Sequence, residues 1–405
     1  MNLDILVTIQ DILLQISTET IETVIYQIQN SSFNTFKRFI ILIKIIFEIV
    51  YKKRNLRIYL SALCREFSNF HKNKKKLNEF KHLFLSKFLE IETFSMDIVH
   101  SHIHFYFLCI STKFLTIDEV IDQMQLTVTT EKIANKPYIV YYILLYFSPI
   151  IKTKNNEFYK FLCDQFDHNI KIVMDYSKSL LRHWGHLPER LLWINDFIIQ
   201  NKSKIMDKEE WIEREAILKN GFSENSIESI IVNDDVDQLQ EFISKSGIDI
   251  DDFKCKDSFL LYQEIFGKND IFLLNFAAAL NSIQCFKYLL LNKVKPDNFY
   301  SDLMIYSVKG GNPEIVRILY QRKFSLDGCL VASFLFFHFD IFQWIYQMRN
   351  ENGDEILLET IKNDCLLSFS LHSLKFLCEV DSQDKNSSKK DQLLDIINKK
   401  LLDYS

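Results

Sequence analysis

The amino-acid sequence predicts an all-α protein, in which a helical N-terminal domain is followed by a solenoid of helical repeats. Two observations carry this prediction. The 405 residues include only eight glycines and five prolines, too few to supply the turns of a sheet-rich fold. The second half also carries a weak repeat with a step of about thirty residues, which is within the range of helical repeat arrays.

Residues 1 to about 220 consist of apolar segments with helical spacing, separated by polar stretches. No short repeat is visible in this part of the chain. The run Lys74-Lys75-Lys76 is expected to be a solvated loop between helices. The expected helices are Leu3–Ile16, Thr20–Gln29, Phe36–Tyr51, Leu56–Phe70, Phe80–Ile91, Val120–Met124, Tyr138–Phe147, Phe158–Phe166 and Pro188–Ile199.

The repeat covers residues 221–380 in about five copies, each of which reads as two short helices joined by a turn. The turn of one copy at Asn281 aligns with the turn of the next at Gly311. An apolar column on the second helix contains Phe242, Leu289, Leu319, Ile345 and Leu377, so the steps are 47, 30, 26 and 32 residues. A column of small residues on the first helix contains Ala277, Ser307, Ser333 and Cys365. Such columns are expected where neighbouring helices pack closely.

These copies resemble ankyrin repeats. The strongest match is 275–290, with a small Ala277-Ala278 pair, a turn, and a second helix that ends in Leu289-Leu290. The segment Gly310–Val316 is the next best match and keeps the turn glycine at Gly311. The chain departs from the ankyrin pattern in two ways, because the Thr-Pro-Leu-His start is missing and the turn glycine is absent at Asn281 and Phe337.

More closely, the chain resembles a large family of divergent ankyrin proteins from parasitic protists, whose defining domain has no known function. The segments that carry this resemblance are 213–225, 230–237 and 337–344, with weaker likeness at 115–119 and 141–149. The resemblance implies an intracellular ankyrin-type scaffold, and it supplies no catalytic residues.

Three regions follow from this organisation. We expect a helical N-terminal domain over 1–220, ankyrin-like repeats over 221–380, and a polar loop with a capping helix over 381–405. The loop would be Asp381–Lys390. The helix Gln392–Leu402 would cover the apolar face of the last repeat, because an array needs a polar outer cap to stay soluble.

Composition excludes some classes of protein. The net charge of −5 provides no basic field that would recruit nucleic acid. The eight cysteines are scattered, without a CxxC pair, and most lie in apolar runs, so we expect buried, reduced thiols in a cytoplasmic protein, with a nuclear location as the alternative. The N-terminus has no signal-peptide pattern, and neither Phe39–Tyr51 nor Tyr138–Ile151 has the length of a transmembrane helix.

Two histidine motifs and an acidic segment are candidates for chemistry. In His100-Ser101-His102-Ile103-His104, a helix would place His100 and His104 on one face and His102 on another, which gives two ligands where zinc needs three or four. The motif His183–His186 suits a helix end and turn. The acidic segment from Asp234 to Asp252 lacks the EF-hand pattern and suits a turn and a helix start. We therefore expect no metal, no cofactor and no catalytic site.

The expected function is binding of a protein partner by a non-enzymatic scaffold or adaptor. Loop tips between repeats escape packing constraints and would carry specificity. The candidate residues are Lys293, Lys295, Asp297, Asn298 and Tyr300 at one tip, and Arg322, Lys323, Ser325 and Asp327 at the next. Two alternatives stay open: an enzyme with a cryptic site in the N-terminal domain, and a membrane-surface protein that uses Phe39–Tyr51 with its basic flanks.

Overall fold

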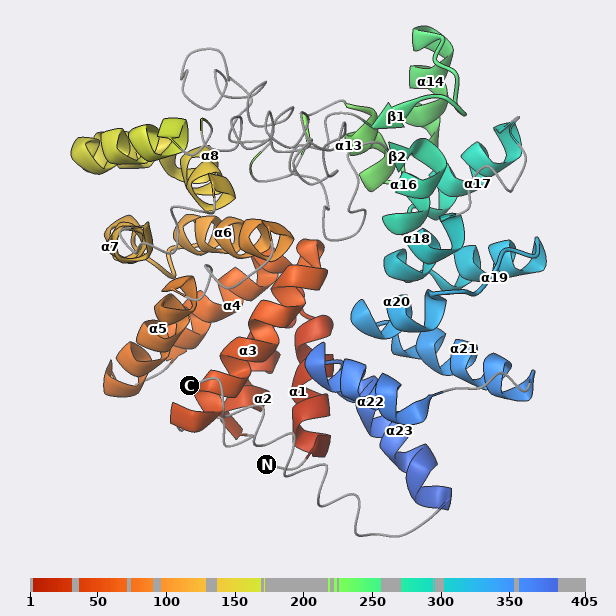
Figure 1. The fold of residues 1–405 in the computed structure, drawn as a ribbon, viewed down its shortest axis with the longest axis horizontal. Coiled ribbons are helices and arrows are strands. Elements are labelled where there is room, and N and C mark those ends of the chain that lie inside the picture. Colours follow the sequence, from red (N-terminus) through yellow and green to blue (C-terminus); the bar gives the residue numbers. More distant parts are fainter. Residues whose placement is uncertain are drawn as a thin grey trace, which may run out of the picture. The chain divides into compact units, whose positions relative to one another are not determined.

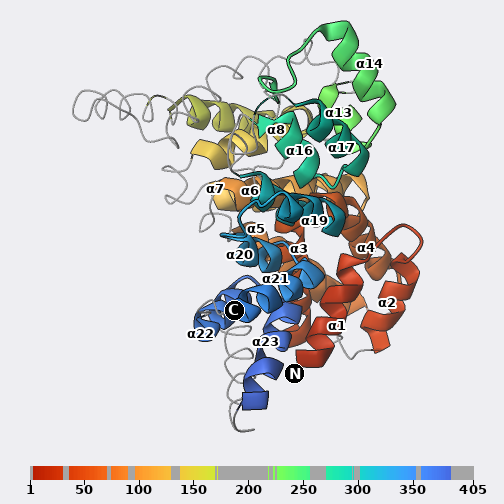
Figure 2. The same ribbon diagram turned by 90° about the vertical axis from the view of Figure 1, so that its right-hand side faces the viewer.

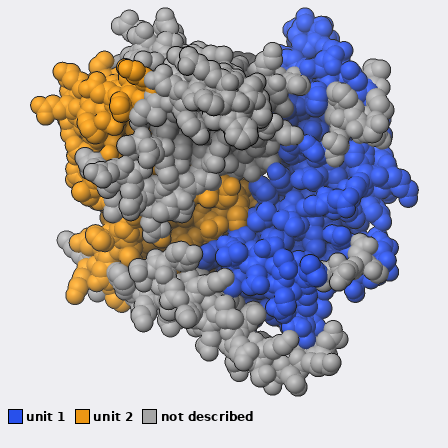
Figure 3. All heavy atoms as spheres, viewed as in Figure 1, with its two compact units in different colours: residues 1–15, 216–405 blue, residues 16–215 orange. Residues whose placement is uncertain are grey.

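The computed structural model describes residues 3–30, 36–70, 74–89, 96–128, 137–168, 171, 218, 222–223, 226–255, 271–293, 295, 302–352 and 357–384. The chain forms two compact units. Unit 1 comprises residues 1–15 together with 216–405, and unit 2 comprises residues 16–215 (Figure 3). In sequence, unit 2 is therefore an insertion between the first helix of unit 1 and the rest of that unit.

The described residues are mostly helical, which confirms the predicted all-α character. The strands β1 (Lys254–Cys255) and β2 (Ile271–Phe272) pair antiparallel in unit 1, with Lys254 opposite Phe272 and Cys255 opposite Ile271. This pair is short and does not form a sheet layer.

Unit 2 is built from helices that alternate between two rows. The helices are α2 (Ile21–Asn30), α3 (Phe36–Lys52), the 3₁₀ turn Arg54–Leu56, α4 (Arg57–Phe70), α5 (Lys74–Leu89), α6 (Met96–Ser111), α7 (Ile117–Val128) and α8 (Pro137–Lys154), followed by a helical segment over 156–168. In one row α2, α4, α6 and α8 contact each other in order, and in the other α3, α5 and α7 do so (Figure 1). Aromatic rings fill much of the space between the helices, and Phe84 contacts Phe47, Phe105 and Phe114 at centroid distances of 5.1, 5.7 and 5.0 Å.

Two expectations for this region were wrong. The lysine run at 74–76 forms the first turn of α5 instead of a loop, because lysine is a good helix former and its long side chain reaches water from a helix start. The expected helix Tyr138–Phe147 continues through Pro149 to Lys154. Its apolar residues from Ile139 to Phe147 and at Ile151 are all buried, so tertiary packing outweighs the cost of the proline. The expected helix Pro188–Ile199 and the motif His183–His186 lie outside the described residues.

The described residues of unit 1 form five helix pairs that follow one another along the chain. They are α13 (Ile227–Val232) with α14 (Val236–Ser246), α16 (Leu273–Ala279) with α17 (Ile283–Asn292), α18 (Leu303–Gly310) with α19 (Pro313–Gln321), α20 (Cys329–Leu335) with α21 (Phe339–Glu351), and α22 (Leu358–Leu367) with α23 (Leu371–Asp384). The first helices contact each other in order from α13 to α22, and second helices of neighbouring pairs also touch, as Figure 2 shows for the green-to-blue succession.

Each pair has one residue with a left-handed backbone at its turn. These turn residues are Asp234 (φ 53°), Asn281 (64°), Gly311 (81°), Phe337 (58°) and Phe369 (55°), and they are spaced by 47, 30, 26 and 32 residues, as the sequence alignment predicts. In four pairs the residue after the turn residue donates its N–H to a carbonyl five residues back, as in Ser282 to Ala277 at 3.0 Å. This hydrogen bond closes a Schellman turn, which explains the left-handed backbone even where glycine is missing.

The N-terminal helix α1 (Leu3–Leu14) packs against α23, the second helix of the last pair that the structure describes (Figure 1). The first fifteen residues thus belong to the repeat-containing unit, which differs from the expected division at 1–220. The helix α23 also runs to Asp384, so the polar loop does not begin at Asp381 as expected. The expected capping helix Gln392–Leu402 lies outside the described residues.

Candidate interaction surface

The tip between the second and third pairs is tied to the acidic segment of the first. The Lys293 ammonium donates to the Lys295 carbonyl oxygen at 2.8 Å, and the Lys295 N–H donates to Asp251 Oδ2 at 3.0 Å. The Lys295 ammonium also lies 3.2 Å from Asp252 Oδ1. Both lysines are half-buried, and these contacts hold the loop against the acidic segment at 251–252. Asp297, Asn298 and Tyr300 lie outside the described residues.

The tip between the third and fourth pairs is a tight and exposed loop. Arg322, Lys323, Ser325 and Asp327 are all exposed. The Ser325 hydroxyl donates to Asp327 Oδ2 at 2.7 Å and accepts from the Asp327 N–H at 3.1 Å, which fixes the loop before α20. The loop thus carries two adjacent exposed cationic side chains, Arg322 and Lys323, and one exposed carboxylate, Asp327. Of the residues expected to bind a partner, this second group has the accessibility that the function requires.

Exposed apolar side chains add to this surface on the first helices. Val331 on α20 is 42% exposed, and Leu367 on α22 is 62% exposed. The half-buried Leu335 lies one turn beyond Val331 and aligns with Leu367 in the next pair, while Ile305 on α18 aligns with Val331. Because α18, α20 and α22 contact each other in order, these positions form one stripe along the first helices.

At the opposite end of the pairs, each turn contacts the pair that follows it. The Asp234 carboxylate accepts the N–H groups of Gln284 and Cys285, both at 2.9 Å, and so caps the start of α17, whose own N-cap Ser282 makes no side-chain cap. Asn281 Oδ1 accepts from Asn312 Nδ2 at 2.5 Å. These contacts fix the register between neighbouring helix pairs, since a helix start needs an acceptor for its free N–H groups.

The same row of contacts continues to α1. The His338 ring covers Gly311 and lies with Nε2 2.9 Å from the Lys309 carbonyl oxygen. In the next step, Phe339 stacks on His372 with centroids 3.8 Å apart. After the last turn no further pair follows within the described residues, and its partner is the Gln10 side chain of α1.

Gln10 is a polar residue on the buried face of α1. Its Nε2 donates to the Phe369 carbonyl oxygen at 2.6 Å, and its Oε1 accepts the Leu371 N–H at 3.0 Å. Two further contacts flank these bonds: an ion pair between Asp4 and Lys375 at 2.6 Å, and a hydrogen bond between Asp11 Oδ1 and His372 Nδ1 at 3.2 Å. This site was not predicted from the sequence. The signal was a glutamine within the helical apolar stripe of Leu3, Leu6, Val7 and Leu13.

The His100–His104 motif of unit 2 is part of a buried network. His100 Nε2 lies 2.9 Å from the Tyr146 hydroxyl, and His104 Nδ1 lies 3.1 Å from the Arg57 guanidinium. His102 points to the other side and contacts the Phe47 ring at 4.7 Å, as helical spacing predicts. Burial and the nearby Arg57 lower the pKa of His102 to about 3.

No group of three or more metal-binding side chains gathers in the described part of the chain. Burial and the nearby Arg57 also lower the pKa of His100 well below its usual range, so His100 and His102 are neutral at pH 7 and pack in the core of unit 2.

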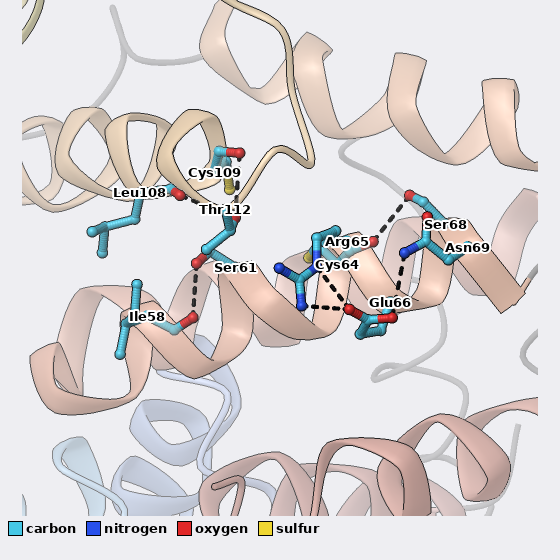
Figure 4. Close-up of polar contacts among 10 residues, drawn as sticks. All are labelled: Ile58, Ser61, Cys64, Arg65, Glu66, Ser68, Asn69, Leu108, Cys109 and Thr112. Carbon is cyan, nitrogen blue, oxygen red and sulfur yellow. Dashed lines mark hydrogen bonds and ion pairs between the residues drawn. The ribbon is translucent and has the colours of Figure 1, made fainter. Parts of the chain in front are cut away.

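Polar contacts elsewhere on α4 and at the end of α6 stay local (Figure 4). The Ser61 hydroxyl donates to the Ile58 carbonyl oxygen at 2.7 Å, and the Thr112 hydroxyl donates to the Leu108 carbonyl oxygen at 3.0 Å. Such bonds to the preceding turn satisfy hydroxyl groups on a helix. The adjacent thiol of Cys109 is buried, and burial raises its pKa well above the usual range. All eight cysteines of the chain are free thiols.

The helix α3 corresponds to the segment that left a membrane-surface role open. From Phe39 to Val50 every side chain is buried except those of Lys44 and Glu48, which are half-buried, so its apolar residues are already packed within the protein. Of its basic flanks, Lys52 is buried, and its ammonium lies 3.2 Å from Glu48 Oε2. None of the described helices combines the length and the apolar character needed to span a membrane.

Comparison of the chain with known protein families, with curated proteins and with solved structures finds no match. Its function is therefore inferred from the geometry of its own residues.

Proposed function

We propose that unit 1 is an ankyrin-like repeat array that binds a protein partner, and that the protein is a non-enzymatic scaffold or adaptor. The observation that supports this proposal is the regular succession of five helix pairs among the residues the structure describes, each with a left-handed turn residue at the aligned position. Stacked helix pairs form an extended surface instead of an enclosed pocket, and such surfaces suit protein recognition.

The binding surface of this proposal combines the tip at 322–327 with the stripe on the first helices. The tip supplies exposed charge from Arg322 and Lys323, and the stripe supplies exposed apolar area from Val331 and Leu367. Apolar contacts with a charged edge are typical of protein interfaces, where the apolar centre contributes most of the affinity and the charges set orientation and the rate of association.

A charge-reversal experiment tests the proposal. The double variant Arg322→Glu/Lys323→Glu is compared with Lys245→Glu/Arg317→Glu, which makes the same change in net charge at exposed positions of second helices. Each full-length chain is used for affinity capture from the native cell, followed by identification of the bound proteins and by thermal melting. We expect the tip variant alone to lose its reproducible partners at an unchanged melting temperature.

Two outcomes would contradict the proposal. Partners retained by both variants would remove the tip from the binding surface. Unfolding of the tip variant would show that these side chains are structural. A Val331→Asp variant then decides whether the apolar stripe binds the same partners.

A further inference from the structure

The last helix pair is covered by a helix from the other end of the chain. The helix α1 contacts α23, and no further helix pair follows α23 within the described part of unit 1. A terminal repeat needs such a cover because its outer face would otherwise expose apolar side chains. The face under α1 is therefore a built docking site for one helix.

The chemistry of this site is specific. Its apolar part receives the stripe of α1 formed by Leu3, Leu6, Val7, Gln10 and Leu13, all 8% exposed or less. Its polar part consists of the Phe369 carbonyl oxygen and the Leu371 N–H, which both bond to Gln10. On the edge of α23, Lys375 pairs with Asp4 and His372 lies beside Asp11, so the site suits an amphipathic helix with carboxylates at these two positions and one amide in its apolar stripe.

The occupant is separable from the rest of unit 1. In sequence α1 is joined to α13 only through unit 2, and the boundary between the units falls between Gln15 and Ile16. Within unit 1, α1 is held by non-covalent contacts, because the chain leaves unit 1 after Gln15 and returns to it only at Ala216. A second copy of this chain carries the same helix with the same acidic edge, and exchange of an identical element is a low-cost route to a dimer.

We propose that the α23 face is an exchangeable docking site, and that α1 of a second copy of this chain can occupy it in place of the chain's own α1. The exchange reproduces every contact of the closed chain, so neither copy loses interactions. It depends on concentration, because an intermolecular helix competes with one held at a high effective concentration in the same chain.

The test uses two full-length variants that cannot close by themselves. Gln10→Lys places an ammonium in the apolar stripe of α1 and leaves its α23 face native. His372→Glu/Lys375→Glu opposes Asp4 and Asp11 with like charge and leaves its α1 native. In a mixture, the native α1 of the second variant meets the native face of the first.

Native mass spectrometry and light scattering of the mixture are the measurements. We expect a heterodimer in the mixture, monomers of each variant alone, and loss of the heterodimer when Gln10→Lys is added to the second variant. Monomers in the mixture at concentrations up to about 100 μM would overturn the proposal, since a micromolar site would then be occupied.

A second measurement tests the proposal even if one of these variants does not fold. A labelled peptide of residues 1–15 is titrated into the full-length variant Gln10→Ala, which removes the amide without placing a charge in the stripe. Fluorescence anisotropy reports binding of the peptide. The native peptide is expected to bind at least about tenfold more tightly than the same peptide with Gln10→Lys. Equal binding of the two peptides would overturn the proposal. Neither measurement involves the tip at 322–327. Failure of the exchange proposal can therefore be distinguished from failure of the proposed partner binding.

Discussion

Gln10 and Phe369 are 359 positions apart in the sequence, and the Gln10 amide donates to the Phe369 carbonyl oxygen at 2.6 Å. This bond places the first helix of the chain on the last turn of the helix pairs. It makes the two ends of the described chain a single packed structure, whereas unit 2 separates them in sequence.

Loss of the Gln10 amide is expected to loosen the last pair. Gln10→Leu keeps the size and apolar character of the stripe but removes both bonds to the backbone of 369–371. We expect a loss of about 1–2 kcal/mol in the free energy of unfolding, because a buried carbonyl and N–H then lose a partner. Hydrogen exchange should accelerate in α1 and α23 and stay unchanged in α16. Gln15→Leu, at an exposed position just after α1, is the matched control. Equal exchange in both variants would show that apolar packing alone holds α1.

Asp234 is expected to couple the first two helix pairs. Asp234→Gly keeps the left-handed turn, which glycine adopts freely, and removes the carboxylate that caps α17. Removal of a cap costs about 1 kcal/mol. Hydrogen exchange should rise at the start of α17. In the control Asp235→Ala, the lost cap belongs to α14, since Asp235 accepts from the Gln238 N–H at 2.9 Å. A rise confined to α14 in both variants would contradict the coupling.

Gly311 is expected to be required for the contact with the fourth pair. A methyl group at this position would lie 1.8 Å from the His338 ring, and the left-handed backbone (φ 81°) adds its own cost. We expect Gly311→Ala to lose about 2–4 kcal/mol of unfolding free energy. Gly247→Ala has the same type of backbone with open space around it, so it should lose only about 1 kcal/mol. In a double-mutant cycle, His338→Ala should recover part of the loss in Gly311→Ala. Additive losses would show that the ring is not what excludes the methyl group.

The buried histidines should make unit 2 sensitive to acid. The pKa of His102 is about 3 in the folded chain, and the unfolded value is near 6.5. Between these values the unfolded chain binds more protons, so stability is present above pH 6.5 and falls as the pH drops toward 3. His102→Leu should reduce this pH dependence in urea unfolding of the full chain, whereas His82→Leu, at an exposed position of α5, should not. The same slope in both variants would assign the acid sensitivity to other groups.

The sequence predicted the helical character and the spacing of the turns with little error. Asn281 and Gly311 align in sequence, and both adopt the left-handed backbone at the end of a first helix. This success has a local cause, because helix periodicity and turn geometry depend on residues within a few positions of one another. The tip at Arg322 and Lys323 is exposed for the same reason, since it joins two short helices.

The partners of the local elements could not be predicted in the same way. Lys295 was expected at a free tip but pairs with Asp252, and the lysines at 74–76 begin a helix. In unit 2 no repeat was visible, yet its helices alternate between two rows. Varied aromatic residues such as Phe47 and Phe84 fill the space between these helices, so the packing repeats while the residue types do not.

The sequence by itself determined the helical character of the chain and the spacing of the turns in unit 1, because these follow from the pattern of neighbouring side chains. Only the tertiary structure decided that α1 covers the last pair and that Asp234 caps a helix of the next pair. Contacts across hundreds of residues depend on which faces remain uncovered after local folding. A single glutamine in the apolar stripe of α1 indicates that this helix packs against another element, but it does not identify that element.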